Sequence, residues 1–157
     1  AAEAGLAVSD GVDVDAGLRT SDPHIFAVGD IANHDHPLFG RLRIEHWATA
    51  LNQPAVAAAN MLGHDQPYEK LPYFYTDQFG FGMEYRGHAS GRDTLVIRGD
   101  LDALEFHAFW LDDQHRVLAG MNVNLWDDGE AIAELVRQRR TVDPDRLADP
   151  AVPLTDL

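Results

Sequence analysis

The chain has 157 residues with 45% hydrophobic content, and its 26 acidic against 12 basic residues give a formal net charge of −14. This acid excess disfavours nucleic acid and anionic membrane surfaces as partners, and no apolar run is long enough to span a membrane, so we expect a globular cytoplasmic protein. The sequence holds no cysteine, which excludes disulfides, a redox-active cysteine pair and thiolate metal ligands, so any redox chemistry must come from a cofactor.

The first elements are a helix end and a hairpin. Residues 1–6 have the pattern of a last helical turn closed by Gly5, and we expect the sequence to begin inside an element of a longer polypeptide. Asp10-Gly11 then predicts a hairpin turn, after which Val12 and Val14 share one face of a strand.

The next apolar run, Ile25 to Val28, lies between Asp22-Pro23 and Gly29-Asp30. It predicts a short buried strand with a ligand-facing end, since sites in open α/β sheets lie where strands stop. Gly29 allows close approach to the backbone, and Asp30 places a carboxylate that suits a ribose-like or ribitol-like diol. The alternative role for Asp30 is to cap the following turn.

Residues 32–43 are expected to form a loop. Its His34-Asp35-His36 string has the residue types of a metal site, but two histidines two residues apart without a further ligand are weak support. Segments rich in Asn, Asp and Pro are ordinary turns, and we expect no metal.

A helix is predicted from Thr49 to Leu62, stopped by Gly63. Pro54 either kinks it or begins its regular part. The helix start offers free N–H groups and partial positive charge to an electron-rich carbonyl, such as the pyrimidine edge of a flavin, although Trp47 could equally be only an aromatic anchor. The residues expected to face the core at helical spacing are Leu51, Ala55, Ala58, Ala59 and Leu62.

The composition changes after the polar turn at residues 63–67, which we take as a domain boundary. Three consecutive aromatic residues follow in Leu71–Gln78, where Pro72 keeps the chain extended. Residues 94–97, 105–111 and 117–125 are β-rich and predict an antiparallel sheet. The apolar stripe of a helix that covers this sheet is Ile132, Leu135 and Val136.

Three ordered motifs carry a resemblance to a known family. Thr20 to Asp30 resembles the second flavin-contact motif of FAD-dependent pyridine-nucleotide reductases. Arg43-Ile44-Glu45, followed by an aromatic residue and a long helix, resembles the pattern of the ferredoxin reductase type, although Pro54 departs from it. Pro72 to Gln78 resembles the segment that opens the C-terminal domain of these reductases. Neither Gly-x-Gly-x-x-Gly loop of the family occurs in the sequence, so the chain resembles the C-terminal part of such an enzyme.

The resemblance implies a fold class: an α/β remnant of a flavin-binding domain at residues 1–67, then an α+β C-terminal domain at 68–157, with an antiparallel sheet and covering helices. It also implies a flavin site, in which Asp30, after Gly29, binds the ribityl chain and Tyr75 lies near the flavin. The backbone at the helix start would face the isoalloxazine, at the residues His46, Trp47 and Ala48.

The function implied for the parent is an oxidoreductase that passes electrons from NAD(P)H through FAD to a ferredoxin-type iron–sulfur protein, with the chemistry belonging to the flavin. The chain alone is expected to be inactive and to self-associate through exposed strands. One alternative is a non-catalytic dimerisation or docking module. Another is a related flavin reductase whose acceptor is rubredoxin or another protein.

Overall fold

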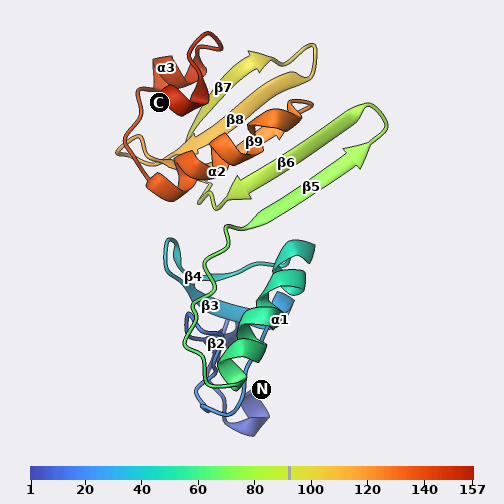
Figure 1. The fold of residues 1–157 in the computed structure, drawn as a ribbon, viewed down its shortest axis with the longest axis vertical. Coiled ribbons are helices and arrows are strands. Elements are labelled where there is room, and N and C mark those ends of the chain that lie inside the picture. The colour runs from blue at the N-terminus through green and yellow to red at the C-terminus, as the bar shows by residue number, and fades with distance from the viewer. Residues whose placement is uncertain (92) are drawn as a thin grey trace. The chain divides into compact units, whose positions relative to one another are not determined.

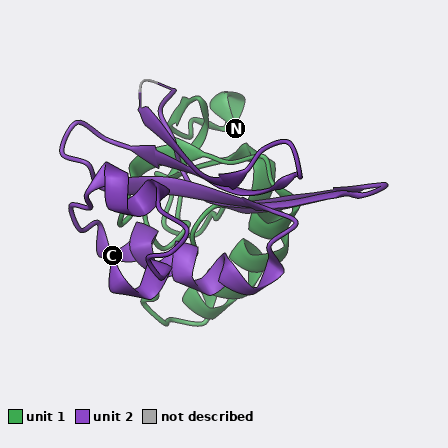
Figure 2. Cartoon of the chain, turned by 90° about the horizontal axis from the view of Figure 1, so that it is seen from above, with its two compact units in different colours: residues 1–72 green, residues 73–157 purple. Residues whose placement is uncertain are grey.

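The computed structural model describes residues 1–91 and 93–157. They form two compact units, residues 1–72 (unit 1) and residues 73–157 (unit 2), which Figure 2 colours separately. The two units divide after Pro72, and Tyr68, only 4% exposed, packs in the core of unit 1. In the part of the chain that the structure describes, no helix combines the length and the apolar character that crossing a membrane requires.

Unit 1 is built on a four-stranded sheet in the order β1-β2-β3-β4 (Figure 1). The central pair, β2 and β3, is parallel, and the two outer pairs are antiparallel. The predicted hairpin is confirmed, since Ser9 pairs with Gly11, and Val12 and Val14 are buried. The strands are β1 (Val8–Ser9), β2 (Gly11–Val14), β3 (Ala32–His36) and β4 (Gly40–Arg43).

Two expectations for this unit are wrong. Ile25 to Val28 is not a strand: Phe26 makes one isolated bridge to Arg19, and Ile25 is 40% exposed. The reason is local, because a turn in which His24 N–H donates to the Asp22 carboxylate occupies the start of the run and Gly29 ends it, leaving too few residues for a ladder. Residues 32–43 are not a loop but the antiparallel pair β3 and β4, in which His34 lies opposite Leu42.

Helix α1 (Trp47–Met61) runs through Pro54 without interruption, but the face expected to be buried is exposed. Leu51 is 60% and Leu62 83% exposed, whereas the buried face carries polar side chains. Hydrogen bonds fix this orientation: the Asn60 amide donates to the carbonyls of Gly17 and Gln66 and accepts from the Gln66 N–H. The buried residues of α1 are Thr49, Gln53, Ala57 and Asn60.

Unit 2 contains the predicted antiparallel sheet, here with five strands in the order β5-β6-β9-β8-β7. A helix crosses one face of the sheet, as expected (Figure 1). The predicted stripe is confirmed, since Ile132 and Val136 are fully buried and Leu135 nearly so. The strands and helices are β5 (Tyr73–Gln78), β6 (Phe81–Gly87), β7 (Thr94–Asp100), β8 (Glu105–Leu111), β9 (Val117–Val123), α2 (Gly129–Gln138) and α3 (Pro144–Ala148).

The close approach of α2 to the sheet depends on Gly120 in β9. A Cβ at this position would come within 2.4 Å of the Ile132 side chain and 3.2 Å of Phe109, so only glycine fits below the helix. The small residue therefore lets Ile132 fill the space over the middle of the sheet.

The C-terminal segment is attached to β7 by one buried side chain. Arg98, 7% exposed, donates hydrogen bonds to four backbone carbonyls after the first turn of α3. Arginine suits this role because its planar guanidinium presents several donors in fixed directions. The acceptors are Asp149 at 2.6 Å, Val152 at 2.7 Å, Pro150 at 3.3 Å and Leu147 at 3.4 Å.

Candidate functional site

The predicted Gly29-Asp30 position forms a tight turn at the entrance to β3. Gly29 begins the short 3₁₀ helix Gly29–Ile31 and has a left-handed φ of 73°. The turn packs on α1, where a Cβ at Gly29 would lie 3.5 Å from the Ala50 Cβ. The Asp30 side chain is exposed, and none of the described residues donates a hydrogen bond to its carboxylate. The turn therefore presents a free carboxylate, and Asp30 does not cap the turn.

The start of α1 lies beside this turn. His46 is the N-cap residue, and its carbonyl accepts from the N–H groups of Thr49 and Ala50. None of the described residues accepts from the N–H groups of Trp47 and Ala48, which is the usual condition of a first helical turn. The Trp47 ring is 69% exposed. The structure thus brings Gly29 and Asp30 into contact with the helix that begins at Trp47.

Arg43, at the end of β4, ties the turn to the neighbouring segments. Its guanidinium donates to the Asp30 carbonyl at 3.1 Å and pairs with Asp10 at 3.1 Å and with the Glu45 carboxylate. The hydrogen bonds that Arg43 donates to these two carboxylates raise the pKa of its guanidinium, and the bond to Glu45 is the larger cause. Because the arginine holds the Asp30 backbone and not its side chain, the Asp30 carboxylate stays available.

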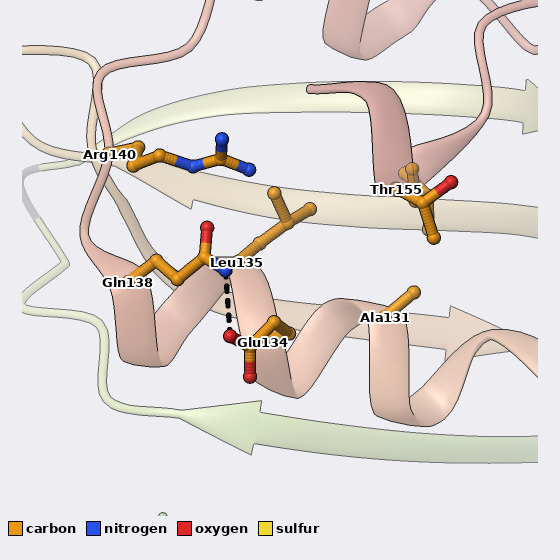
Figure 3. A pocket seen from close by; sticks show the side chains of 7 residues that line it. Ala131, Glu134, Leu135, Gln138, Arg140 and Thr155 are labelled. Carbon is orange, nitrogen blue, oxygen red and sulfur yellow. Dashed lines mark hydrogen bonds between the residues drawn. The ribbon is translucent and has the colours of Figure 1, made fainter.

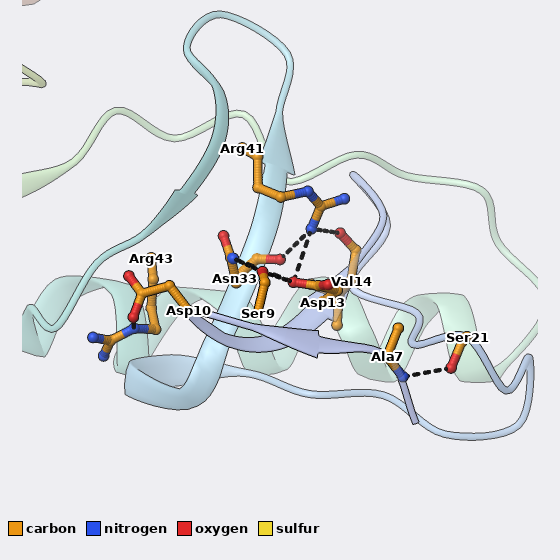
Figure 4. Close-up of polar contacts among 9 residues, drawn as sticks. All are labelled: Ala7, Ser9, Asp10, Asp13, Val14, Ser21, Asn33, Arg41 and Arg43. Carbon is orange, nitrogen blue, oxygen red and sulfur yellow. Dashed lines mark hydrogen bonds and ion pairs between the residues drawn. The ribbon is translucent and has the colours of Figure 1, made fainter. Parts of the chain in front are cut away.

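Arg41, the other base of β4, is engaged within the sheet (Figure 4). It donates to the Asn33 carbonyl at 2.7 Å and to the Val14 carbonyl at 3.3 Å, and it lies 3.7 Å from the Asp13 carboxylate. Arg41 therefore belongs to the structural polar contacts of β2 and β3.

Tyr75 belongs to β5 in unit 2 and is 52% exposed. The ring centroids of Tyr75 and the neighbouring Tyr73 are 6.2 Å apart. The Tyr73 hydroxyl donates a hydrogen bond to the Glu84 carboxylate at 2.6 Å. Burial and this hydrogen bond raise the pKa of Tyr73 to about 12, and the Arg86 guanidinium lies over its ring. Tyr73 is thus held by its neighbours, whereas Tyr75 offers an accessible aromatic face.

His34 and His36 are both buried on one face of β3, with ring centroids 5.5 Å apart. His36 accepts from the Leu38 N–H, and its other nitrogen lies 3.3 Å from the Lys70 carbonyl. Among the described residues, no group of three or more histidine, cysteine or acidic side chains is placed to hold a metal. The pair belongs to the core of unit 1, next to the ring of Tyr68.

A pocket in unit 2 lies between α2 and the 3₁₀ helix Leu154–Asp156 (Figure 3). Its volume of about 120 Å³ is below the several hundred Å³ typical of ligand pockets. It contains none of the predicted flavin-site residues. It is lined by Ala131, Glu134, Leu135, Gln138, Arg140, Leu154 and Thr155.

The residues of unit 1 fit part of a flavin. A free carboxylate suits the hydroxyls of a ribityl chain, and the unpaired N–H groups at the start of α1 suit the pyrimidine carbonyls. One residue that the sequence patterns missed also belongs here: Gln53, fully buried in α1, accepts a hydrogen bond from the Gly29 N–H at 2.7 Å. A pattern in the sequence could have identified Gln53, because the polar residues Thr49, Gln53 and Asn60 recur at helical spacing.

We expect Gly29→Ala to lower the free energy of unfolding of unit 1 by about 1 kcal/mol, because an L-residue is strained at a left-handed φ. Gly40, with φ of 72° and no atom within 4 Å of a built Cβ, is the matched control and should cost the same when changed to Ala. Urea unfolding measures both. A cost at Gly29 more than twice that at Gly40 would identify packing against Ala50, and not backbone strain, as the constraint.

Comparison with known families gives two matches. The family described as Reductase C-terminal matches residues 73–157, and Pyridine nucleotide-disulphide oxidoreductase matches residues 1–54. The chain is 45% identical, over 96% of its length, to the ferredoxin–NAD(+) reductase component of the anthranilate 1,2-dioxygenase system of Burkholderia cepacia. It is 35% identical over its whole length to putidaredoxin reductase CamA of Pseudomonas putida. The chain spans 37% of the length of each of these relatives.

Solved structures agree with the sequence matches. The ferredoxin reductase for the CYP199A2 system of Rhodopseudomonas palustris has a TM-score of 0.88 and 33% identity, covering 98% of this chain and 38% of that one. The covalent putidaredoxin reductase–putidaredoxin complex has a TM-score of 0.88 and 35% identity, covering 99% of this chain and 37% of that one. The fold of the chain therefore matches segments of much longer proteins.

Proposed function

Because the chain belongs to the Reductase C-terminal family, matched over residues 73–157, we propose that it is the C-terminal part of an FAD-dependent NAD(P)H:ferredoxin oxidoreductase. The match of residues 1–54 to Pyridine nucleotide-disulphide oxidoreductase supports the presence of part of an FAD-binding domain. The single observation that carries the proposal is the contact between the Gly29-Asp30 turn and the helix start at Trp47. Both predicted parts of a flavin site occur together in one folded unit.

The residues of this chain would hold and orient the cofactor. Asp30 would accept hydrogen bonds from ribityl hydroxyls, and the N–H groups of Trp47 and Ala48, after the cap residue His46, would face the pyrimidine edge. Tyr75 would lie near the flavin. The chemistry that FAD supplies when bound is the conversion of a hydride transfer from NAD(P)H into single-electron transfers.

The electron acceptor in this proposal is a ferredoxin-type iron–sulfur protein. The support comes from relatives that are ferredoxin–NAD(+) reductase components and from the neighbour solved as a complex with putidaredoxin. A cytoplasmic location belongs to the same proposal, because NAD(P)H is an intracellular electron donor. The exposed ring of Tyr75 also fits a place near the acceptor, where an aromatic side chain contributes contact area.

The test is FAD binding by the full-length protein. Asp30→Ala should raise the dissociation constant for FAD roughly 30-fold, because one charge-assisted hydrogen bond contributes about 2 kcal/mol. Binding to the apoprotein is followed by flavin absorbance, and NADH-dependent ferredoxin reduction confirms the activity of the parent.

Asp35→Ala is the control, since it removes another exposed carboxylate of unit 1, in β3. Its FAD affinity should equal that of the parent protein. Equal affinities for the Asp30 and Asp35 variants would contradict the role of Asp30. A full-length protein that binds no FAD would contradict the proposed function itself.

A further inference from the structure

We propose that Gln53 is a positioning residue that holds the Gly29-Asp30 turn in the conformation that binds the ribityl chain of the flavin. The inference rests on the proposed function. Gln53 does not contact the cofactor in this proposal; it acts through the Gly29 backbone, to which its side-chain oxygen is bonded at 2.7 Å.

The first argument is the cost of placing a glutamine here. Gln53 is fully buried, and its side-chain Nε2 has no hydrogen-bond partner among the described residues. A buried donor without a partner is unfavourable, and an apolar side chain of similar shape would fill the same space without that cost. The stability of α1 therefore does not account for a glutamine, whereas the bond to Gly29 does.

The second argument is the conformation of the turn. Gly29 is buried and left-handed, and its buried N–H needs an acceptor inside the unit. Gln53 is that acceptor, and it stands on the helix whose first turn offers the unpaired N–H groups. One hydrogen bond thus fixes the distance between the two predicted halves of the flavin site.

The third argument is that two side chains hold the turn from opposite sides. Arg43 holds the Asp30 carbonyl from the exposed side of the turn, and Gln53 holds the Gly29 N–H from the buried side. With both bonds present, the backbone on either side of the Asp30 Cα is fixed, and the carboxylate is preorganised. A preorganised acceptor binds more tightly because less freedom is lost on binding.

The experiment measures two properties of Gln53→Met, which removes the acceptor and keeps a similar volume. In the 157-residue chain, hydrogen exchange followed by NMR should show at least tenfold faster exchange of the Gly29 amide. In the full-length protein, the dissociation constant for FAD should rise at least tenfold. Gln53→Glu keeps an oxygen at the same place, and it should restore both properties to within threefold of the parent.

Asn60→Leu is the matched control, because Asn60 is the other amide on the buried face of α1, bonded to Gly17 and Gln66 and not to the turn. It should lower the melting temperature but leave Gly29 exchange and FAD affinity within twofold of the parent. Unchanged FAD affinity in Gln53→Met would overturn the inference, as would equal losses in the Gln53 and Asn60 variants.

The two proposals fail in different ways. If the parent protein binds no FAD, the proposed function fails, and the Gly29 exchange rate in the chain still shows whether Gln53 holds the turn. If the parent protein binds FAD but Gln53→Met binds it equally well, only the positioning role fails. Slow Gly29 exchange in Gln53→Met would also overturn that role, because the turn would then be held by other contacts.

Discussion

Replacing Arg98 by methionine is expected to lower the free energy of unfolding of unit 2 by about 4 kcal/mol, because hydrogen bonds from a charged group contribute about 1.5 to 3 kcal/mol each. Four carbonyls of residues 147–152 share this one donor group, so they lose their partner together. The total stays below the sum of four bonds because the freed carbonyls regain water. The C-terminal segment should detach from β7 before the sheet unfolds.

The measurement is a urea titration followed by NMR, in which amides of β7 and α3 report on unit 2. Arg137→Met is the control, since Arg137 pairs with Glu130 at the surface of α2 and exposed ion pairs contribute about 0 to 1 kcal/mol. In the Arg98 variant, a protease should cleave the chain after residue 147 before it cleaves within the sheet. A loss as small as that of the Arg137 variant would show that the segment is held by its apolar residues, Leu147 and Leu154.

Unit 1 is expected to lose about 3 kcal/mol of stability as the pH falls from about 6.5 to about 4, given 1.36 kcal/mol per unit of pKa difference. Burial lowers the pKa of His34 to about 4, and the nearby His36 and Arg41 add to the effect while Asp35 opposes it. The unfolded chain therefore binds this proton first, so acid favours unfolding. The contribution of His34 to stability is fully present above the pKa of about 6.5 in the unfolded chain, and it is lost as the pH falls to about 4.

The pH profile of urea unfolding, followed on amides of unit 1, measures this contribution. His34→Leu should flatten the profile between pH 6.5 and 4, because the ring that resists protonation is gone. His24→Leu, which replaces an exposed histidine, should leave the profile as it is. If the stability of the His34 variant falls with pH as steeply as that of the parent, the acid sensitivity comes from other groups.

The elements that the sequence predicted well are those with strong periodicity or turn chemistry. The Asp10-Gly11 hairpin, the strands β7, β8 and β9 and the stripe of Ile132 and Val136 needed only local patterns. The run Ile25 to Val28 failed because a short apolar segment does not distinguish a strand from a packed loop. Among the described residues, the one strand-like pairing of this run is the isolated bridge of Phe26 to Arg19.

Helix α1 shows why apolar spacing alone can orient a helix wrongly. Leu51 and Leu62 suggested the inner face, but Gln53 and Asn60 occupy it because their amides bond to backbone groups of Gly29, Gly17 and Gln66. Those partners are distant in sequence, so no local pattern names them. Self-association of the chain stays a prediction, although Val12 and Val14, two of the residues expected to be exposed for it, lie in the inner strand β2.

The candidate site was predicted in part. The residues Gly29, Asp30 and Trp47 were identified by motif and by helix chemistry, and the structure places the turn against the helix. The restraint by Arg43 and Gln53 was not predicted, because it depends on which side chains reach the turn in three dimensions. Tyr75 lies in unit 2, and its place at the flavin stays a prediction.

The exposure of Trp47 has an optical consequence. It is the one tryptophan of residues 1–72, and the other two, Trp110 and Trp126, lie in unit 2. Tryptophan emits light where flavins absorb, so a flavin bound beside this indole would quench its fluorescence by resonance energy transfer. With Trp110 and Trp126 replaced by phenylalanine, Trp47 would be the one source of tryptophan fluorescence. Its quenching would then follow a cofactor titration without any attached dye.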